Sequence, residues 1–502
     1  MRRVYRYLKF VAGVWVSREY RSDADVVQSQ SDTLCVDLDG TLVRTDTLHE
    51  AILLYLRGNP FRLFRLIGWL WHGKAAFKHR VAEQVELQAH TLPYNKDVLR
   101  LIKNYRESGG RIVLATAANR RFAERVAEHL GVFDEVVASG DVNLYRQAKC
   151  DVLTARFGKK NFDYVGDHRD DLPTIAVARS AYLVGGSLTL KRAAGTANPD
   201  IRFVQVERSS LRILLKALRP HQWSKNGLIF VPLFASDQFA NPILLLQAFV
   251  AFLSFSLAAS AVYVFNDLTD LASDRVHLLK RRRPFASGAL SITTGVVMFP
   301  LLLGIAATLA FYLHWAFALV LTTYVALTTA YSLRLKRQVA VDVLLLAGLY
   351  TIRIVAGSAA TMIAPSFWLL AFSMFIFLSL ALGKRYSELK EIGEGTAMIP
   401  GRGYQPSDLL IILALGTGSG LVSVLVFGLY TQSPFVAAHY ARAEFLWLVP
   451  PILLYWVTRL WVKYGRNEIH DDPVIFATTD WQSIVSGGSI VLIFLLARSI
   501  WW

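Results

Sequence analysis

The pattern of hydrophobic and polar positions changes near residue 211, and this change predicts two regions of different architecture. Before it, apolar runs are short: Leu34–Val36 leads into Asp37, and runs at 111–115 and 162–165 also end in polar clusters. Short buried runs that alternate with helical segments are typical of βαβ units with a parallel sheet. We therefore expect an α/β region whose polar clusters gather at the carboxyl ends of the strands, where such sheets bind ligands.

Beyond residue 211 the chain carries apolar segments long enough to cross a bilayer. Hydropathy predicts about nine of them, the first short enough to be partly re-entrant. Every second loop between them is basic, which is the pattern of the positive-inside rule. The expected fold is therefore an N-terminal α/β region with a parallel sheet, followed by an all-α, polytopic membrane domain. The family resemblance given below implies that a helical insertion in the α/β region is a cap. The nine segments lie at about 226–236, 243–265, 292–311, 315–333, 343–362, 367–383, 408–430, 445–462 and 483–500.

These patterns also predict the domain boundaries. The segment Phe10 to Val16 is too short to span a bilayer, so we expect a surface-lying arm there. In the cap, arginines interleave with Trp, Phe and Leu, which fits a helix in a membrane interface and a helix packed on the α/β core about equally. The predicted boundaries are an arm at 1–30, an α/β domain at 31–190 with its cap at about 48–95, a linker at 191–215 and a membrane domain at 216–502.

Composition is consistent with a membrane protein. Hydrophobic residues make up 54% of the 502 residues, and the formal net charge is +16. Because the basic residues fall in short runs between apolar segments, positive-inside loops explain the charge and no nucleic acid is expected. Cys35 and Cys150 suit the reducing cytosol better than a disulfide framework. The expected location is the inner (cytoplasmic) membrane, multi-pass, with the α/β domain and both candidate sites on the cytoplasmic side and Trp501-Trp502 on the other.

A group of carboxylates follows the apolar segment 243–265. If the helix continues through them, Asp267, Asp270 and Asp274 share one face, with Asn266 beside them. Three carboxylates that close repel one another unless a cation lies between them, and hard oxygen ligands suit Mg²⁺. With a basic run nearby, the pattern indicates a site for Mg²⁺ and a diphosphate. The alternative is an acidic helix end that faces solvent.

The α/β region resembles the haloacid dehalogenase (HAD) phosphatases over about residues 32–184. Four motifs carry the resemblance: 37–41 (DLDGT), Thr116 after the second strand, Lys149, and 166–171 (GDHRDD). The resemblance implies that Asp37 is the nucleophile, that Asp39 is the general acid and base, and that Thr116 and Lys149 bind phosphoryl oxygens. It also implies one Mg²⁺ held by Asp37, Asp39, Asp167 and Asp171. The alternative is a degenerate domain retained as a scaffold.

The membrane region resembles the UbiA superfamily of intramembrane prenyltransferases over about residues 218–502. The motif is 266–275 (NDLTDLASDR) followed by 280–288 (KRRRPFASG), and segments at 219–226, 331–336 and 383–389 resemble in particular the decaprenyl-phosphate phosphoribosyltransferases. The resemblance implies one or more Mg²⁺ on Asn266, Asp267, Asp270 and Asp274. The further residues expected to bind phosphate or substrate are Lys225, Asn226, Arg275, Arg282, Arg283, Tyr331, Arg334, Lys336, Asp342, Arg353, Lys384 and Arg385.

The second polar loop separates this branch from prenyltransferases of aromatic acceptors, which usually carry a second paired-aspartate motif there. This chain offers only Asp342, beside Tyr331 and basic residues that also serve membrane topology. Arg353 stands inside an apolar span and is expected to face a cavity, where it pairs with phosphate or a carboxylate. One acidic half and one basic half would hold one Mg²⁺-diphosphate and one further phosphate.

The expected function is a bifunctional membrane enzyme. It would transfer 5-phosphoribosyl from phosphoribosyl pyrophosphate (PRPP) to polyprenyl phosphate, and its HAD domain would then remove the 5-phosphate to give polyprenylphosphoryl ribose. Two alternatives stay open: an aromatic prenyltransferase that uses a polyprenyl diphosphate, with an independent HAD phosphatase, and a non-enzymatic lipid carrier or scaffold. The expected partners are PRPP, polyprenyl phosphate and the lipid bilayer, and the oligomeric state is left open.

Overall fold

The computed structural model describes residues 33–140, 143–205, 211–392, 402–469 and 473–498. The chain forms two compact units. The first unit comprises residues up to 208 together with 272–282 and 286–292, and the second comprises 209–271, 283–285 and 293–502. Each unit is described by itself. The arm predicted at 1–30 and the terminal Trp501-Trp502 lie outside the described residues.

A parallel six-stranded sheet forms the centre of the first unit, in the order β3-β2-β1-β4-β5-β6. The predicted parallel sheet is confirmed, and β1 lies between β2 and β4 because Leu34 pairs with both Ile112 and Asp163. The strands are β1 (Thr33–Val36), β2 (Arg111–Asn119), β3 (Glu135–Ser139), β4 (Asp163–Gly166), β5 (Ala181–Val184) and β6 (Ile201–Val204). Around them are α5 (Lys96–Glu107), α6 (Arg120–Leu130), α7 (Gln147–Phe157), η4 (Arg169–Asp171), α8 (Leu172–Val177) and α9 (Leu188–Ala197).

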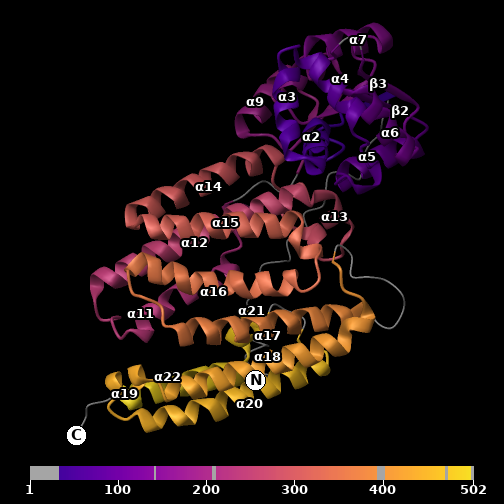
Figure 1. Cartoon of the computed structure of the whole chain (residues 1–502). Helices are drawn as coiled ribbons and strands as arrows, with labels where there is room; N and C mark the ends of the chain where they lie inside the picture. Colours follow the sequence, from indigo (N-terminus) through magenta and orange to yellow (C-terminus); the bar gives the residue numbers. More distant parts are fainter. Residues whose placement is uncertain (1–32, 141–142, 206–210, 393–401, 470–472, 499–502) are drawn as a thin grey trace, which may run out of the picture. The chain divides into compact units, whose positions relative to one another are not determined.

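The helical cap predicted between β1 and β2 is present (Figure 1). Its first helix begins where the Asp46 side chain accepts hydrogen bonds from the Leu48 and His49 amides. Tyr55, Leu66 and Phe77 are buried in one hydrophobic core with the sheet. The cap elements are α2 (Thr47–Gly58), η2 (Pro60–Arg62), α3 (Leu63–Leu70), α4 (Lys74–Gln84) and η3 (Ala89–Thr91).

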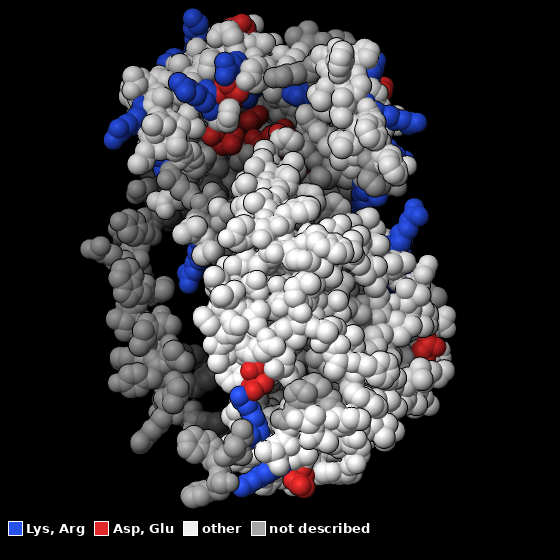
Figure 2. All heavy atoms as spheres, turned by 60° about the vertical axis from the view of Figure 1, so that its left-hand side comes forward, with Lys and Arg blue, Asp and Glu red and all other residues white. Residues whose placement is uncertain are grey.

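The second unit is all-helical, and eight of its described segments are long and apolar enough to cross a membrane. Figure 2 shows that much of its visible surface lacks charged side chains, as expected where lipid is the solvent. The helices in these segments are α12 (Pro242–Thr269), α14 (Ile292–Leu313), α15 (Trp315–Leu333), α16 (Val341–Thr361), α17 (Phe367–Ile392), α18 (Leu409–Thr431), α20 (Val449–Gly465) and α22 (Trp481–Arg498). Short connecting elements are η7 (Leu335–Arg337), η8 (Pro406–Asp408), α19 (Pro434–His439), η9 (Ala443–Leu448) and α21 (Pro473–Thr479).

The ninth segment, predicted at 226–236, does not form a long helix. Instead α10 (Leu211–Leu218), η5 (Pro220–Phe230) and α11 (Val231–Ala235) follow one another. Hydrogen bonds nevertheless place this broken segment antiparallel along α12. Ser260 donates to the Leu218 carbonyl, Trp223 donates to Ser260, and Asn226 donates to Ser256.

This packing explains why irregular backbone is tolerated at that place. Non-helical backbone is stable at membrane depth only where protein covers it. Ile229 and Leu233 are fully buried. Gly357 of α16 approaches so closely that an added Cβ would lie 2.0 Å from the Ile229 carbonyl oxygen. These buried positions of the broken segment are therefore covered by protein, whereas Phe234 near its end is 61% exposed.

The helix after residue 265 also differs from expectation. α12 ends at Thr269, and α13 (Leu271–Val276) starts after Asp270, whose φ of −103° and ψ of 11° leave the helical region. Its amide still donates to the Asn266 carbonyl at 2.9 Å. The continuous helix face predicted for the three aspartates is therefore wrong, because the chain bends between the second and third of them. Asp274 belongs to the first unit, and Asp267 and Asp270 belong to the second.

Candidate active sites

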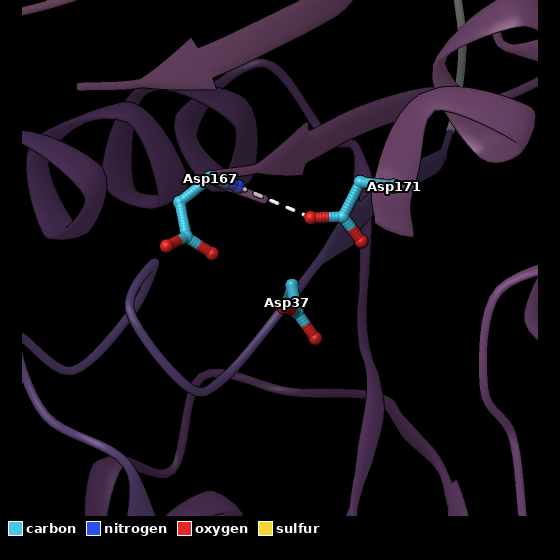
Figure 3. A group of neighbouring side chains, drawn as sticks. All are labelled: Asp37, Asp167 and Asp171. Carbon is cyan, nitrogen blue, oxygen red and sulfur yellow. Dashed lines mark hydrogen bonds between the residues drawn. The ribbon is translucent and has the colours of Figure 1, made fainter. Parts of the chain in front are cut away.

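In the first unit, carboxylates meet at the carboxyl ends of two neighbouring strands. Asp37 follows β1, and its amide donates to the Val165 carbonyl of β4 at 3.0 Å. Asp167 and Asp171 follow β4, and ligand oxygens of all three aspartates lie within 4.8 Å of one another. Figure 3 shows the three side chains gathered there, with the Asp167 amide bonded to Asp171. Among the described residues they form the only such group of three acidic, His or Cys side chains.

Lys149 of α7 connects two of these carboxylates. Its Nζ lies 3.3 Å from Asp37 Oδ1 and 2.7 Å from Asp171 Oδ1. Asp171 also accepts from the Tyr164 hydroxyl at 2.7 Å and from the His168 amide at 3.1 Å. A buried lysine between two carboxylates is held in one position, from which a transferring phosphoryl oxygen could replace part of the carboxylate contact.

Burial and like charge control the protonation of this group. Burial raises the pKa of Asp37 to about 6; Lys149 lowers it and Asp171 raises it further. Burial, Asp37 and Asp171 raise the pKa of Asp167. Burial alone would raise the pKa of Asp171, but Lys149 and its hydrogen bonds hold it below the ordinary value. The site thus has excess negative charge that favours a cation.

The close packing of the loop fits a small cation. An added Cβ on Gly40, whose φ is +76°, would lie 2.2 Å from Asp167 Oδ2. The Thr41 hydroxyl donates to the other Asp167 oxygen at 3.1 Å. Oxygen ligands from two strand ends, with no room for a larger side chain at residue 40, suit Mg²⁺.

The carboxylate of Asp39 is placed differently from its expected role as a metal ligand. It is not part of the group of three, because it accepts from the Thr47 amide at 2.8 Å and from the Thr47 hydroxyl at 3.3 Å. Burial, with Asp46 nearby, raises its pKa well above the ordinary value. A carboxyl group that keeps its proton can donate it, so the position suits a general acid better than a ligand.

Thr116 lies near the end of β2 and is buried. Its hydroxyl accepts from the Ala118 amide at 3.0 Å. The adjacent Ala117 carbonyl accepts from Lys78 of cap helix α4 at 3.0 Å. The cap therefore contacts β2 directly beside Thr116, which is expected to bind phosphoryl oxygens.

In the second unit, Asp267 is buried at the end of α12 and faces two arginines. One of its oxygens lies 2.5 Å from Arg219 and 3.2 Å from Arg283. Its other oxygen and the Asn266 side-chain oxygen are buried without a hydrogen-bond partner. Two unsatisfied buried acceptors on consecutive residues are costly unless a cation or donor completes them. These oxygens fit a hard metal ion.

Deeper in the second unit, Arg353 of α16 joins a buried polar chain. Its Nε donates to the Asn226 side chain at 2.9 Å, and Asn226 in turn donates to Ser256 at 2.9 Å. The guanidinium lies 5.3–5.5 Å from the rings of Phe255, Tyr324 and Tyr350, and Lys225 lies 5.7 Å from Tyr350. Arg353 is thus enclosed by aromatic faces as well as hydrogen-bonded.

Asp342, at the start of α16, is fully buried among cations. Arg385 Nε lies 2.6 Å from one oxygen, and Arg402 and the Tyr331 hydroxyl lie 3.2 Å and 2.8 Å from the other. Both arginines also pair with Glu388. Tyr331 and Arg385, both among the residues expected to bind phosphate or substrate, therefore contact Asp342.

The remaining predicted residues differ in their exposure and in the unit to which they belong. Arg334 and Arg282 are exposed, and Lys336 and Lys384 are partly buried. Arg275 pairs instead with Glu50 of α2 and donates to the Ala286 carbonyl at 3.0 Å, all within the first unit. Asp274 is buried in the first unit and Asp270 is partly buried in the second.

Several contributors were not predicted. Arg219 and Arg402 pair with aspartates 48 and 60 residues away. Arg219 begins the motif that contains Lys225 and Asn226, so its neighbours were a signal for it. Arg402 follows a loop with no distinguishing pattern, and nothing in the sequence indicates its partner.

Comparison with known proteins agrees with both units. The pattern of haloacid dehalogenase-like hydrolases matches residues 34–176, and that of the UbiA prenyltransferase family matches residues 228–476. A protein of Sinorhizobium fredii, "Uncharacterized protein y4nM", is 36% identical over 479 residues, which are 95% of this chain and 92% of that one. The chain belongs to the UbiA prenyltransferase family. Its UbiA domain is preceded by a HAD phosphatase domain, as the motifs predicted.

Two further relatives match a smaller part of this chain. Nodulation protein NoeC of Azorhizobium caulinodans is 36% identical over 284 residues, covering 56% of this chain and 92% of its own. Decaprenyl-phosphate phosphoribosyltransferase of Mycobacterium tuberculosis is 36% identical over 226 residues, covering 43% of this chain and 73% of its own. The protein is thus a multi-pass membrane enzyme with a UbiA-type transferase domain and a HAD phosphatase domain.

Proposed function

We propose that the protein is a two-step membrane enzyme. The UbiA domain transfers 5-phosphoribosyl from PRPP to polyprenyl phosphate, and the HAD domain removes the 5-phosphate to give polyprenylphosphoryl ribose. The observation that carries this choice of substrates is the state of Asp342, which is shared between the buried Arg385 and the partly buried Arg402. The name of the M. tuberculosis relative supports the same substrate pair.

Asp342 separates the proposal from aromatic prenyl transfer. A carboxylate already paired with Arg385 and Arg402 is a poor ligand for a second metal ion, since both its oxygens are occupied. Guanidinium groups, by contrast, suit phosphate oxygens. A site with one acidic half at Asp267 and a basic half around Asp342 fits one diphosphate and one further phosphate.

In the transfer step, the phosphate oxygen of the polyprenyl phosphate attacks the anomeric carbon of PRPP, and the bond to pyrophosphate breaks. The nucleophile is already ionised at neutral pH, so no strong base is required. Arg219 and Arg283, now paired with Asp267, are placed to bind anionic oxygens of the leaving group. Asn226 holds the guanidinium of Arg353 in one orientation, so that it presents a fixed charge.

In the second step, Asp37 attacks phosphorus of the 5-phosphate and the ribose oxygen leaves with the proton of Asp39. Water then hydrolyses the aspartyl phosphate, with Asp39 accepting its proton. Thr47 holds the Asp39 carboxyl through two hydrogen bonds, and Lys149 holds phosphoryl oxygens. Magnesium, held by Asp37, Asp167 and Asp171 in one site and by Asn266 and Asp267 in the other, would neutralise phosphate charge.

We place both sites on the cytoplasmic side. Arg219 pairs with Asp267, so the chain enters the helical bundle at the same end at which α12 finishes. The loop after α12 carries Lys280 to Arg283, and basic loops stay in the cytoplasm. The broken segment antiparallel to α12 supplies the additional crossing that this topology needs.

A double-label experiment tests the proposal. Purified full-length protein in lipid nanodiscs receives polyprenyl phosphate, Mg²⁺ and PRPP that carries ¹⁴C in the ribose and ³²P in the 5-phosphate. Wild-type protein should give lipid with ¹⁴C only and release ³²P as inorganic phosphate. Asp37→Asn should give lipid with both labels, and Asp267→Asn should give neither.

Each other result contradicts a part of the proposal. Lipid that carries both labels with wild-type protein would show that the HAD domain does not act on the transfer product. Absence of label from lipid, with consumption of polyprenyl diphosphate and an aromatic acceptor, would favour the aromatic prenyltransferase. Lipid movement without PRPP consumption would favour a carrier.

A further inference from the structure

One face of the cap helix α3 is apolar and exposed. Phe64 is 72% exposed, and Trp71 directly after the helix is 87% exposed, as is Phe61 before it at 75%. Leu63, Ile67 and Leu70 share this face and are also exposed. Because these positions repeat at intervals of three and four residues, they form a single stripe along the helix. We call residues 61, 63, 64, 67, 70 and 71 the α3 stripe.

The other side of α3 is fixed to the cap, so the exposure is not that of a loose segment. Leu66 is buried in the core of the first unit. Trp69 packs on Tyr55 with ring centroids 5.4 Å apart, and Arg62 lies 5.0 Å above the same ring. Arg62 also donates to the Tyr55 carbonyl at 3.1 Å. The helix is thus held with its apolar stripe outward, which is costly in water unless something covers it.

The charge around the stripe has one sign. Between Glu50 and Glu83 the chain carries six Lys or Arg residues and no Asp or Glu. Arg57 and Arg65 are exposed near the stripe. Apolar side chains flanked by cations, without anions, match an anionic bilayer surface, where rings enter the interface and arginines contact headgroups. The same chain carries eight segments able to cross a membrane, so a bilayer is always within reach.

We propose that the α3 stripe docks on the surface of the anionic bilayer that holds the UbiA domain. The sequence left two interpretations of this segment open, and the exposure of Phe64 and Trp71 favours the membrane one. The substrate consequence rests on the proposed function: the HAD site would take a phosphomonoester whose carrier lipid stays in the bilayer. Helix α4, which follows α3, contacts the end of β2 beside Thr116 through Lys78, so a docked cap is directly joined to the proposed phosphate site.

Depth-dependent quenching tests the docking. Trp71→Cys is labelled with an NBD fluorophore in full-length protein, in nanodiscs with and without nitroxide-labelled anionic lipid. Unmutated protein, whose Cys35 and Cys150 are buried, measures background labelling. The matched control is Lys103→Cys on α5, where the lysine side chain is 75% exposed. The expected result is blue-shifted NBD emission at residue 71, with quenching about threefold or more above that at residue 103.

Equal quenching at the two positions would overturn the proposal. A blue shift at residue 71 that appears only in discs with two protein copies, without quenching by nitroxide lipid, would also overturn it. The stripe would then contact a second copy and not the lipid. Replacing anionic with neutral lipid should weaken the quenching, since the flanking charges lose their partners.

A second measurement separates docking from catalysis. Phe64→Glu combined with Trp71→Glu should lower hydrolysis of a phosphomonoester lipid in the bilayer by about tenfold or more, because two aromatic side chains no longer leave water. Hydrolysis of p-nitrophenyl phosphate should stay unchanged, which also shows that the domain folds. Unchanged hydrolysis of both substrates would overturn the proposal. Absence of NBD quenching in the Trp71→Cys protein would contradict the docking proposal but not the proposed function. Absence of hydrolysis of both substrates by the wild-type protein would contradict the proposed function but not the docking.

Discussion

The two candidate sites treat buried carboxylates in opposite ways. In the HAD domain, Asp37, Asp167 and Asp171 lie together with one lysine, and negative charge is in excess. In the UbiA domain, Asp267 and Asp342 each face two arginines. A cation from solution can complete the first arrangement. Within a membrane domain an uncompensated charge is far more costly, so arginines of the protein compensate both carboxylates, and at Asp267 one oxygen is left for a further cation.

The difference also indicates what each site must do. Repulsion among the HAD carboxylates favours metal binding, and the raised pKa of Asp39 keeps that acid protonated, which suits hydrolysis of a phosphomonoester. Arginine-paired carboxylates hold guanidinium groups in fixed positions, where they can bind phosphates once substrate arrives. Four substitutions, taken from the largest expected effect to the smallest, test this contrast.

Asp342→Asn should cause the largest effect, a loss of unfolding free energy. It leaves the buried Arg385 and the partly buried Arg402 with Glu388 as their remaining carboxylate partner, and breaking a buried pair costs about 3–5 kcal/mol. Denaturant unfolding of the full chain in detergent, followed by helical circular dichroism, measures the effect. Asp237→Asn, which breaks the half-exposed pair with Arg498, should cost at most about 1 kcal/mol. Equal costs for the two variants would show that burial does not matter at Asp342.

Among the described residues, Lys149 is the only cation paired with the group Asp37, Asp167 and Asp171, and Lys149→Met removes it. Hydrolysis of a soluble phosphomonoester should fall by about 10²–10³-fold, because charge on the transferring oxygens loses its stabiliser. Transfer of phosphoribosyl to lipid should be unaffected. Lys103→Met, at an exposed site, is the control. Retained phosphatase activity in Lys149→Met would contradict the assigned role.

Magnesium binding to the HAD domain should weaken in acid. The pKa of Asp37 is raised to about 6 by burial, so its carboxylate is protonated below that pH and a proton competes with the metal. The Mg²⁺ concentration for half-maximal phosphatase activity should rise about tenfold for each pH unit below about 6. Steady-state assays between about pH 7 and about pH 5 check this. A constant value across that range would contradict the raised pKa.

Asp167→Asn should have the smallest effect. It should raise the free energy of unfolding, whereas Asp342→Asn lowers it. In buffer without divalent ions, Asp167→Asn removes a carboxylate whose pKa is raised by burial and by the like charges of Asp37 and Asp171. The HAD domain should therefore gain up to about 1 kcal/mol of stability, while Thr41 can still donate to the amide oxygen. Thermal unfolding with chelator present measures it. Destabilisation in chelator would indicate that the group is not repulsive.

The sequence determined the parts of this protein that depend on local pattern. Strand ends carry DLDGT and GDHRDD, so parallel pairing of β1 with β4 brings Asp37, Asp167 and Asp171 together, as predicted. Apolar length likewise determines the eight long membrane segments, because a helix must bury its backbone polar groups internally in lipid.

Only the tertiary structure decided which distant charges meet. Arg402 pairs with Asp342 across 60 residues of sequence, and Arg219 pairs with Asp267 across 48. The local composition around these two arginines does not distinguish them from other arginines of the chain. The bend after Thr269, the broken segment along α12 and the bond of Asp39 to Thr47 were also not foreseen. The physical reason is that periodicity records whether a residue is buried, whereas the partner of a buried charge depends on how the helices and loops pack.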